Sequence, residues 1–292
     1  MNHQNRFLPA AILTLLSLIW GTSFILIKQG LKSFSPDEVG ALRVTAASFF
    51  LLPIALMRMK ELRKGDVPKL LFAGLMGTFI PAFLFATAQT RISSSVTGIM
   101  NSLSPLFTVL MGAVFFGQKV KGYALGGILV AFAGSLVLML SSSGWQLSGI
   151  NSYALLIVLA CAMYGFNLNF IKYRITGLNP LTLTAVAIAL VGPLAAYYLF
   201  GVSDFTMKLQ LIDGAWRSMG FIVLLGLMST AIATVLFTYL VQVTSPLFAS
   251  SVTYLMPVVS VLWGVIDHEL LFIGHFAGMI MILGGVWIAN RR

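Results

Sequence analysis

The chain contains ten apolar segments, each close to the length that crosses a lipid bilayer. A transmembrane helix needs about 20 consecutive, mainly apolar residues. We place the segments at residues 8–27, 38–57, 70–89, 95–117, 122–141, 153–171, 180–200, 218–241, 248–266 and 270–290. Their number and length predict an all-α membrane protein with ten transmembrane helices.

The composition agrees with a lipid environment. Hydrophobic residues make up 59% of the 292 residues and charged residues only 9%, whereas soluble domains have roughly 45–50% and 25%. Residues 122–171 and 218–266 carry no charge, and each stretch is too long for one span. Turn-forming residues at Ser141–Gly144 and Gln242–Pro246 divide them. The connecting segments are short, so we expect no extramembrane domain.

The distribution of positive charge predicts the orientation. The net charge of +10 lies in short clusters between apolar segments, and no basic run alternates with aromatic residues as a nucleic-acid surface would require. If the N-terminus is cytoplasmic, 12 of the 18 Lys and Arg residues fall on the cytoplasmic side. The positive-inside rule therefore predicts a multi-pass protein of the cell (inner) membrane with both termini in the cytoplasm.

The two halves of the sequence repeat each other. Trp20-Gly21, Lys28 and Pro36 recur 144 residues later. The second copies are Tyr164-Gly165, Lys172 and Pro180. Two further matches pair Pro105 and Gly112 with Pro257 and Gly264, and Gly127 and Gly134 with Gly278 and Gly285. Each half holds an odd number of spans, so the second must enter the membrane from the opposite side. We therefore expect two inverted five-helix repeats, residues 1–145 and 146–292, an architecture common among secondary transporters.

Four segments carry a family resemblance: LIWGTSFILIK, ALRVTAASFFLLP, SPLFTVLMGAVFFGQ and MPVVSVLWGVIDHELL. They are similar to the EamA family of the drug/metabolite transporter superfamily, and the likeness extends over both repeats. The resemblance implies ten helices and outward movement of amino acids, related metabolites or toxic organic compounds. Family members often carry Gly-Glu after the fourth helix of each repeat. This chain has Gly117-Gln118 in the first repeat and His268-Glu269 in the second.

Polar and aromatic residues at mid-membrane depth are the candidate substrate-binding residues, because polar groups there are costly unless they face the bundle interior. Trp20 and Ser23 share one helix face, and Tyr164 and Asn167 repeat that pattern. The fourth and ninth helices add Asn101 and Tyr254, close to Pro105 and Pro257. Each proline frees a backbone carbonyl. The alternative is that the aromatic residues anchor the interface and the polar groups only join helices.

Three basic residues near the span ends have a structural interpretation. We expect Arg43 to reach towards the membrane surface or to pair with Asp267 or Glu269. Lys28 and Lys172 occupy equivalent positions at opposite membrane faces, where we expect interfacial anchors. The alternative is that they attract anionic groups of a substrate.

The sequence predicts a secondary transporter that exports amino acids or related small metabolites by alternating access. It has no P-loop, so transport does not use ATP hydrolysis by this chain. A flippase of lipid or lipid-linked substrates and a multidrug exporter are the alternatives, although no span carries the mid-membrane Glu of cation-exchanging small multidrug exporters. An intramembrane enzyme would need paired carboxylates, a Ser/His set or a metal cluster, which the spans lack.

We therefore expect no catalytic residue, metal or cofactor. The expected partners are a small-molecule substrate and the bilayer, and no nucleic acid. The sequence leaves open the substrate, the direction of transport, the coupling ion and the oligomeric state.

Overall fold

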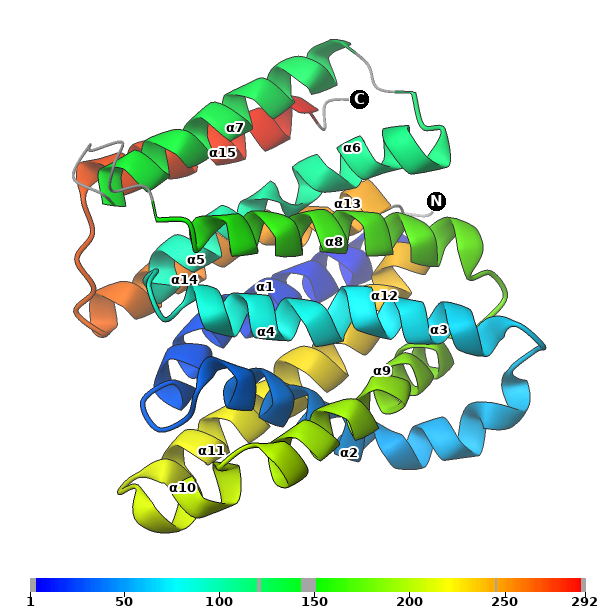
Figure 1. Ribbon diagram of the computed structural model, residues 1–292. Helices are drawn as coiled ribbons and strands as arrows, with labels where there is room; N and C mark the ends of the chain where they lie inside the picture. The colour runs from blue at the N-terminus through cyan, green and yellow to red at the C-terminus, as the bar shows by residue number, and fades with distance from the viewer. Residues whose placement is uncertain (1–3, 120–121, 143–150, 245, 290–292) are drawn as a thin grey trace.

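The computed structural model describes residues 4–119, 122–142, 151–244 and 246–289, and the regular secondary structure in these ranges is all helical. Each of the ten apolar segments contains helix. Six of them form one main helix: α1 (Gln4–Gly30), α2 (Pro36–Arg58), α7 (Gly122–Ser142), α8 (Ala154–Arg174), α9 (Pro180–Tyr197) and α15 (Ile273–Ala289). The helices run side by side, and α1 begins at the same end of the molecule at which α15 finishes (Figure 1).

The other four segments are interrupted at mid-span, and the interruptions occur in corresponding pairs. The third and eighth segments contain π-helical turns, η2 (Leu75–Phe79) between α3 (Asp66–Gly74) and α4 (Ile80–Ala88), and η6 (Gly226–Ile232) between α11 (Ala215–Leu225) and α12 (Ala233–Val243). The fourth and ninth contain 3₁₀ turns, η3 (Asn101–Leu103) between α5 (Ser94–Met100) and α6 (Ser104–Phe116), and η7 (Ser251–Tyr254) between α13 (Pro246–Ser250) and α14 (Met256–Ile266). Such turns inside helices often mark functional sites.

The described residues include three further short elements, η1 (Met59–Glu61), η5 (Tyr198–Val202) and α10 (Phe205–Leu211). The separate helix α10 was not predicted from the sequence. Among the described residues, seven helical spans are long and apolar enough to cross a membrane, and two shorter apolar helices lie at 256–266 and 273–285.

Helix starts show the same correspondence between the halves. Ser35 caps α2, where its hydroxyl accepts from the Glu38 amide and the Glu38 carboxylate accepts from the Ser35 amide. The side chain of Asn179 accepts from the Leu181 amide at the start of α9. In both helices proline is the first residue, where its missing N–H costs nothing. Each repeat therefore defines the start of its second helix locally.

Helices of one half pack mainly against helices of the other half. Helix α1 packs on α14, and its counterpart α8 packs on α6; α2 packs on its own counterpart α9, and α7 on α15. Gly21 makes the first of these contacts, because a Cβ there would lie 2.5 Å from Cβ of Val259. Gly165 makes the equivalent one, 2.5 Å from the carbonyl carbon of Phe107. The fold is therefore two inverted repeats of five helical segments.

The α7–α15 pair lies along one edge of the bundle (Figure 1). A Cβ on Gly285 would lie 2.5 Å from the Gly127 carbonyl oxygen, and one on Gly134 would lie 2.9 Å from that of Gly278. These are the glycines of the spacing repeated in the sequence, and their missing side chains let the two backbones approach closely.

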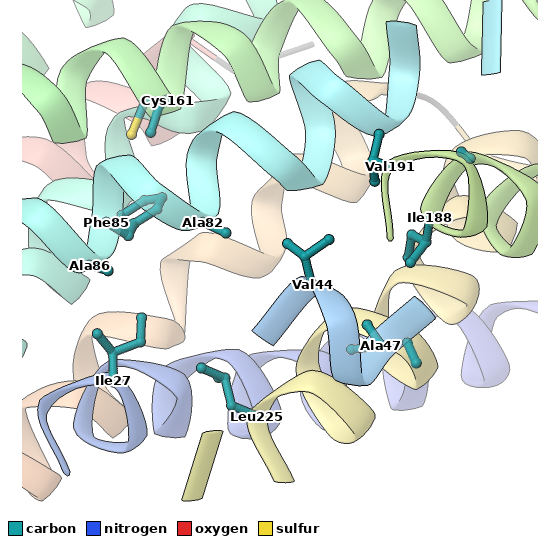
Figure 2. Close-up of a cluster of buried hydrophobic side chains, with 14 of the residues drawn as sticks. Ile27, Val44, Ala47, Ala82, Phe85, Ala86, Cys161, Ile188, Val191 and Leu225 are labelled. Carbon is teal, nitrogen blue, oxygen red and sulfur yellow. The ribbon is translucent and has the colours of Figure 1, made fainter. Parts of the chain in front are cut away.

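Apolar side chains from both halves form the core between the helices (Figure 2). Ile27 of α1, Val44 of α2, Phe85 of α4, Val191 of α9 and Leu225 of α11 belong to it, and each is buried. Large apolar side chains also cover the outside, among them Phe49, Met57 and Tyr197, each 73% exposed. Exposed apolar surface on this scale requires a lipid environment.

Candidate substrate-binding site

A cavity of about 120 Å³ lies where the interrupted helices of both repeats meet α1, α2 and α8. Residues of η2, η3, η6 and η7, or directly next to them, contribute to its wall. Because a broken helix leaves backbone groups and side chains free to turn inwards, the paired interruptions give this part of the apolar bundle a polar lining. It contains hydroxyl and amide side chains, five aromatic rings and one charged residue.

Five of the six residues proposed from the sequence line this cavity: Trp20, Ser23, Asn101, Tyr164 and Asn167. The side chain of the sixth, Tyr254, lies outside those that the structure describes. The geometry thus brings the two sequence patterns together at one place. Their role in substrate binding remains a prediction.

Trp20 connects α1 to the π-helical turn of the eighth segment. Its indole N–H donates to the Ser229 carbonyl oxygen at 2.9 Å, and its ring packs edge-on against Phe237 of α12 at 4.8 Å between centroids. Ser23, one turn further along α1, hydrogen-bonds the Ser229 hydroxyl. The polar face of α1 is therefore oriented by η6.

Tyr164 has the equivalent aromatic neighbour in the other repeat. Its ring stacks on Phe85 of α4, with centroids 5.9 Å apart and planes at 21°. Since α4 and α12 are the corresponding segments of the two repeats, Trp20–Phe237 and Tyr164–Phe85 are related pairs, and all four residues line the cavity. Trp20 and Tyr164 therefore have equivalent places in the cavity wall, and their role in binding a substrate stays a prediction.

The two asparagines differ in how far their hydrogen bonds are satisfied. The Asn101 carbonyl oxygen, four residues before Pro105, accepts from the Ser104 hydroxyl at 2.8 Å, and its side-chain oxygen accepts from the same hydroxyl at 3.3 Å. The side-chain oxygen of Asn167 is buried and has no hydrogen-bond partner among the described residues. Gly77 leaves the space that the Asn167 amide occupies.

The expectation for Arg43 was wrong. Its Nε donates to the Thr230 hydroxyl at 2.7 Å, and both residues line the cavity. Asp267 and Glu269, its expected partners, bind Lys28 instead. Thr230 follows Ser229 in the π-helical turn η6, which holds it at the cavity wall. The sequence feature that could have indicated a place at the cavity is the position of Arg43 inside an apolar span, where a charge usually has a functional role.

At one end of the bundle, an ion-pair cluster joins three segments; we call Lys28, Ser94, Ser95, Asp267 and Glu269 the Lys28 cluster. The lysine ammonium lies 2.6 Å from the Asp267 carboxylate and 2.8 Å from that of Glu269. The Glu269 carboxylate also accepts from the backbone and hydroxyl groups of Ser94 and Ser95, at 2.6–3.1 Å. It thereby satisfies two of the free amides at the start of α5.

Glu269 remains ionised over the physiological pH range. Burial of its side chain acts to raise the pKa, but the hydrogen bonds from Lys28, Ser94 and Ser95 outweigh it and lower the pKa to about 2. A carboxylate whose pKa is depressed on folding stabilises the fold above its ordinary pKa of 4.5 and loses that contribution as the pH falls towards 2. The Lys28 cluster is therefore intact at neutral pH.

The opposite end of the bundle has a different set of contacts around Lys172. This ammonium donates to the carbonyl oxygens of Val241, Gln242 and Thr244, at 2.9–3.2 Å. These carbonyls lie at the C-terminal end of α12, where a positive charge is favourable. One neutral bond, from the Gln118 amide to the Asn169 side-chain oxygen at 2.7 Å, joins the segment after α6 to α8. We call Gln118, Asn169 and Lys172 the Lys172 cluster.

The part of the chain that the structure describes contains no group of three or more His, Cys, Asp or Glu side chains that could hold a metal ion. Cys161 is buried. The chemistry of the site is therefore carried by the cavity wall.

The profile of the EamA-like transporter family matches residues 8–140 and again residues 151–291. The chain belongs to the EamA-like transporter family. It is a multi-pass membrane transporter and not an enzyme, and the family assignment suggested by its motifs is confirmed.

Several relatives are transporters by name. An uncharacterized transporter of Archaeoglobus fulgidus is 28% identical, over 96% of this chain and 98% of its own. The uncharacterized inner membrane transporter YedA of Escherichia coli K12 is 29% identical over 85% and 79%. A probable terminal-alkyne amino-acid exporter of Streptantibioticus cattleyicolor is 23% identical over 97% and 93%. A crystal structure 20% identical, covering 97% of this chain and 96% of its own, has a TM-score of 0.63 and shares the fold.

Proposed function

We propose that this EamA transporter is a secondary transporter that exports amino acids or related small metabolites by alternating access around the cavity. The observation that carries the proposal is a cavity at the junction of the two repeats, with polar groups in a mainly apolar wall and both related aromatic pairs along it. A site between inverted repeats can open to either side as one repeat exchanges conformation with the other.

The size of the cavity supports a small substrate. At about 120 Å³ it is slightly smaller than a cavity of about 150 Å³ that admits benzene. A lipid-linked sugar or a multi-ring drug would need a much larger space. The Streptantibioticus relative, named a probable amino-acid exporter, supports the same substrate class.

We further propose that both termini face the cytoplasm, that the repeats divide near residue 145, and that the protein resides in the inner membrane. The excess of Lys and Arg on that side supports the orientation, and the two profile matches, at 8–140 and 151–291, support the division. In this orientation the Lys28 cluster lies at the outer end of the bundle and the Lys172 cluster at the cytoplasmic end.

Counterflow in proteoliposomes tests the proposal. Vesicles preloaded with unlabelled compound are offered the labelled compound, with a panel of amino acids, nucleobases and labelled lipid. We expect exchange of one or more amino acids, and a Trp20→Ala variant should lower the apparent affinity because it removes one aromatic wall. Exchange of lipid but of no amino acid would favour a flippase and overturn the proposal. Wild-type affinity in Trp20→Ala would remove that residue from the site.

A further inference from the structure

The cavity holds a positive charge that no described residue neutralises. Arg43 is the one charged residue on its wall, and no Asp or Glu belongs to the described lining. The ion pairs of the described residues are Lys28 with Asp267 and Glu269, Arg58 with Glu61, and Lys208 with Glu38. The guanidinium of Arg43 therefore lies inside the bundle without a carboxylate partner.

Only one of the five N–H groups of this guanidinium is used within the described structure. Nε donates to the Thr230 hydroxyl at 2.7 Å, and no hydrogen bond from Nη1 or Nη2 to a described residue is present. The bond to Thr230 fixes one edge of the planar group, while the terminal nitrogens remain available. A guanidinium held in this way can bind both oxygens of a carboxylate in parallel.

A retained, unpaired charge at this depth calls for a functional explanation. A charge inside the membrane is costly, and an apolar or neutral polar residue would avoid that cost. A bound anion would offset it. The lysines at the two ends of the bundle contrast with Arg43, because both already have anionic or carbonyl partners.

The same wall also offers an unused acceptor. The buried side-chain oxygen of Asn167 has no donor among the described residues, and such an acceptor is costly unless a ligand or water satisfies it. The rest of the described wall consists of hydroxyl and amide groups, aromatic rings and aliphatic side chains. A substrate that complements this wall has an anionic group, a hydrogen-bond donor and a small body that packs against rings.

We infer that Arg43 binds the carboxylate of the substrate and that the substrate class is small carboxylates carrying a hydrogen-bond donor for Asn167. This inference rests on the proposed transport function and specifies its substrate. An α-amino acid supplies its ammonium as the donor, and a hydroxy acid supplies its hydroxyl. The shared chemistry is the carboxylate, which the site distinguishes from a neutral ester or amide.

The test compares matched ligands on the purified, reconstituted protein. Each amino acid of the panel is offered as the free acid, as its methyl ester, as its amide and as the corresponding hydroxy acid. Inhibition of counterflow gives the affinities, and the ligand-induced rise in melting temperature gives binding independently of transport. We expect the free acids to bind about 100-fold or more tightly than the esters and amides, as a buried charge pair implies. Binding of the hydroxy acids alone would assign the donor to a hydroxyl.

Variants of Arg43 connect that preference to one residue. Arg43→Gln should lose the discrimination between acid and ester, with affinity for the acid falling about 100-fold. Arg43→Lys keeps the charge without the planar pair of donors and should retain the preference for acids at about 10-fold lower affinity. The Lys variant keeps the test valid if Arg43→Gln fails to fold, which its melting temperature would reveal. Lys32→Gln, at an exposed lysine away from the cavity, is the matched charge control and should change neither quantity.

Three outcomes separate this inference from the transport proposal. Equal affinity of wild type for acids and esters, or unchanged discrimination in Arg43→Gln, would overturn the role of Arg43 while leaving transport intact. Exchange only of compounds that lack a carboxylate would do the same. If no carboxylate binds or exchanges and labelled lipid does, both the inference and the proposed function fail.

Discussion

The two ends of the bundle are related by the repeat, yet they are joined by different chemistry. At the Lys28 cluster, one ammonium and four serine donors converge on the Glu269 carboxylate, joining α1, α5 and the turn before α15. At the Lys172 cluster, the equivalent lysine binds carbonyl oxygens of the eighth segment, and Gln118 replaces the glutamate. One end has an ion-paired junction across three segments, and the other has an ammonium bound to neutral carbonyl oxygens and one neutral hydrogen bond.

The comparison shows how a symmetric fold can favour one conformation. If both ends had the same junction, exchange of the repeats would give two states of equal free energy. Both ends have an ammonium donor, but only the Lys28 cluster adds a carboxylate that accepts from four serine groups, and such charge-assisted bonds are stronger than neutral ones. The end that carries Glu269 should therefore stay closed more firmly. In the proposed orientation this is the outer end, and the conformation described is stabilised on that side.

The largest expected effect comes from removing the charge that distinguishes the two ends. Glu269→Gln leaves Asp267 as the only carboxylate partner of Lys28 and replaces one of the two acceptor oxygens by an amide donor, so the amide and hydroxyl of either Ser94 or Ser95 lose their acceptor. The Glu269 side chain is only 4% exposed, whereas Lys28 is 34% exposed and keeps Asp267. Losing hydrogen bonds to a charged group then costs about 2–3 kcal/mol. We expect a lower melting temperature and separation of α1 from α5. Distances between spin labels at the exposed positions 32 and 91, in a Cys161→Ala background, measure that separation.

A matched variant at the other end serves as the control. Gln118→Ala should leave the 32–91 distance unchanged, because it removes a contact of the Lys172 cluster only. An unchanged distance in Glu269→Gln would show that the Lys28 cluster does not hold that end closed.

The second effect concerns the glycine contacts that the repeats share. A Cβ on Gly165 would meet the backbone of Phe107 and Thr108, whereas one on Gly21 would meet mainly the side chain of Val259. Backbone cannot move aside without shifting a helix, so Gly165→Ala should destabilise by about 2 kcal/mol and Gly21→Ala by less. Melting temperatures of both variants measure this difference.

The double variant Gly21→Ala/Val259→Ala sharpens the glycine comparison. It removes the Val259 Cγ1 that lies 2.8 Å from the added Cβ, and it keeps Cβ of residue 259 at 2.5 Å. It should therefore recover only part of the loss relative to Gly21→Ala alone. Equal destabilisation by the two single variants, with no recovery in the double variant, would contradict the distinction between side-chain and backbone contact.

A smaller effect tests why the first repeat lacks the glutamate. The Asn169 amide nitrogen donates to the carbonyls of Thr108 and Gly165 at 2.9 and 2.8 Å, so its oxygen is the group that faces Gln118. Gln118→Glu would place a carboxylate against that oxygen and leave both acceptors without a donor. We expect a loss of about 1–2 kcal/mol, measured as melting temperature at pH 7.

Gln118→Ala again supplies the reference for this substitution, since it removes the bond without adding a second acceptor. The glutamate variant should therefore be the less stable of the two. If Gln118→Glu is instead as stable as wild type or more stable, the orientation of Asn169 does not explain why the first repeat has glutamine at position 118.

Local patterns were sufficient to predict the spans and most of the candidate site. Each span is a run of apolar residues, and the repeat places Trp20 and Tyr164 at equivalent positions, so both reach the same cavity. The partners of the charged groups were not predictable in this way. Lys28 and Glu269 are far apart in the sequence, as are Arg43 and Thr230. The residues next to Lys28 or Arg43 do not indicate which of several helices packs opposite them. The π-helical turns that hold Ser229 and Thr230 likewise have no recognisable sequence signal.

The smallest effect comes from the turn before Glu269, where the two repeats share a backbone conformation but not a residue. Gly117 and His268 both adopt positive φ, 67° and 55°. Glycine tolerates this left-handed conformation, whereas a Cβ raises its free energy by about 1 kcal/mol or more. His268→Gly should therefore stabilise the protein by about 0.5–1 kcal/mol, after the entropy that glycine loses on folding is subtracted. The reverse substitution, Gly117→Ala, should destabilise by a similar amount, because no neighbouring atom lies within 4 Å of the added Cβ and the backbone alone decides the result. Melting temperatures of the two variants should move in opposite directions. A lower melting temperature in His268→Gly would mean that the histidine side chain makes a contribution that outweighs its backbone conformation.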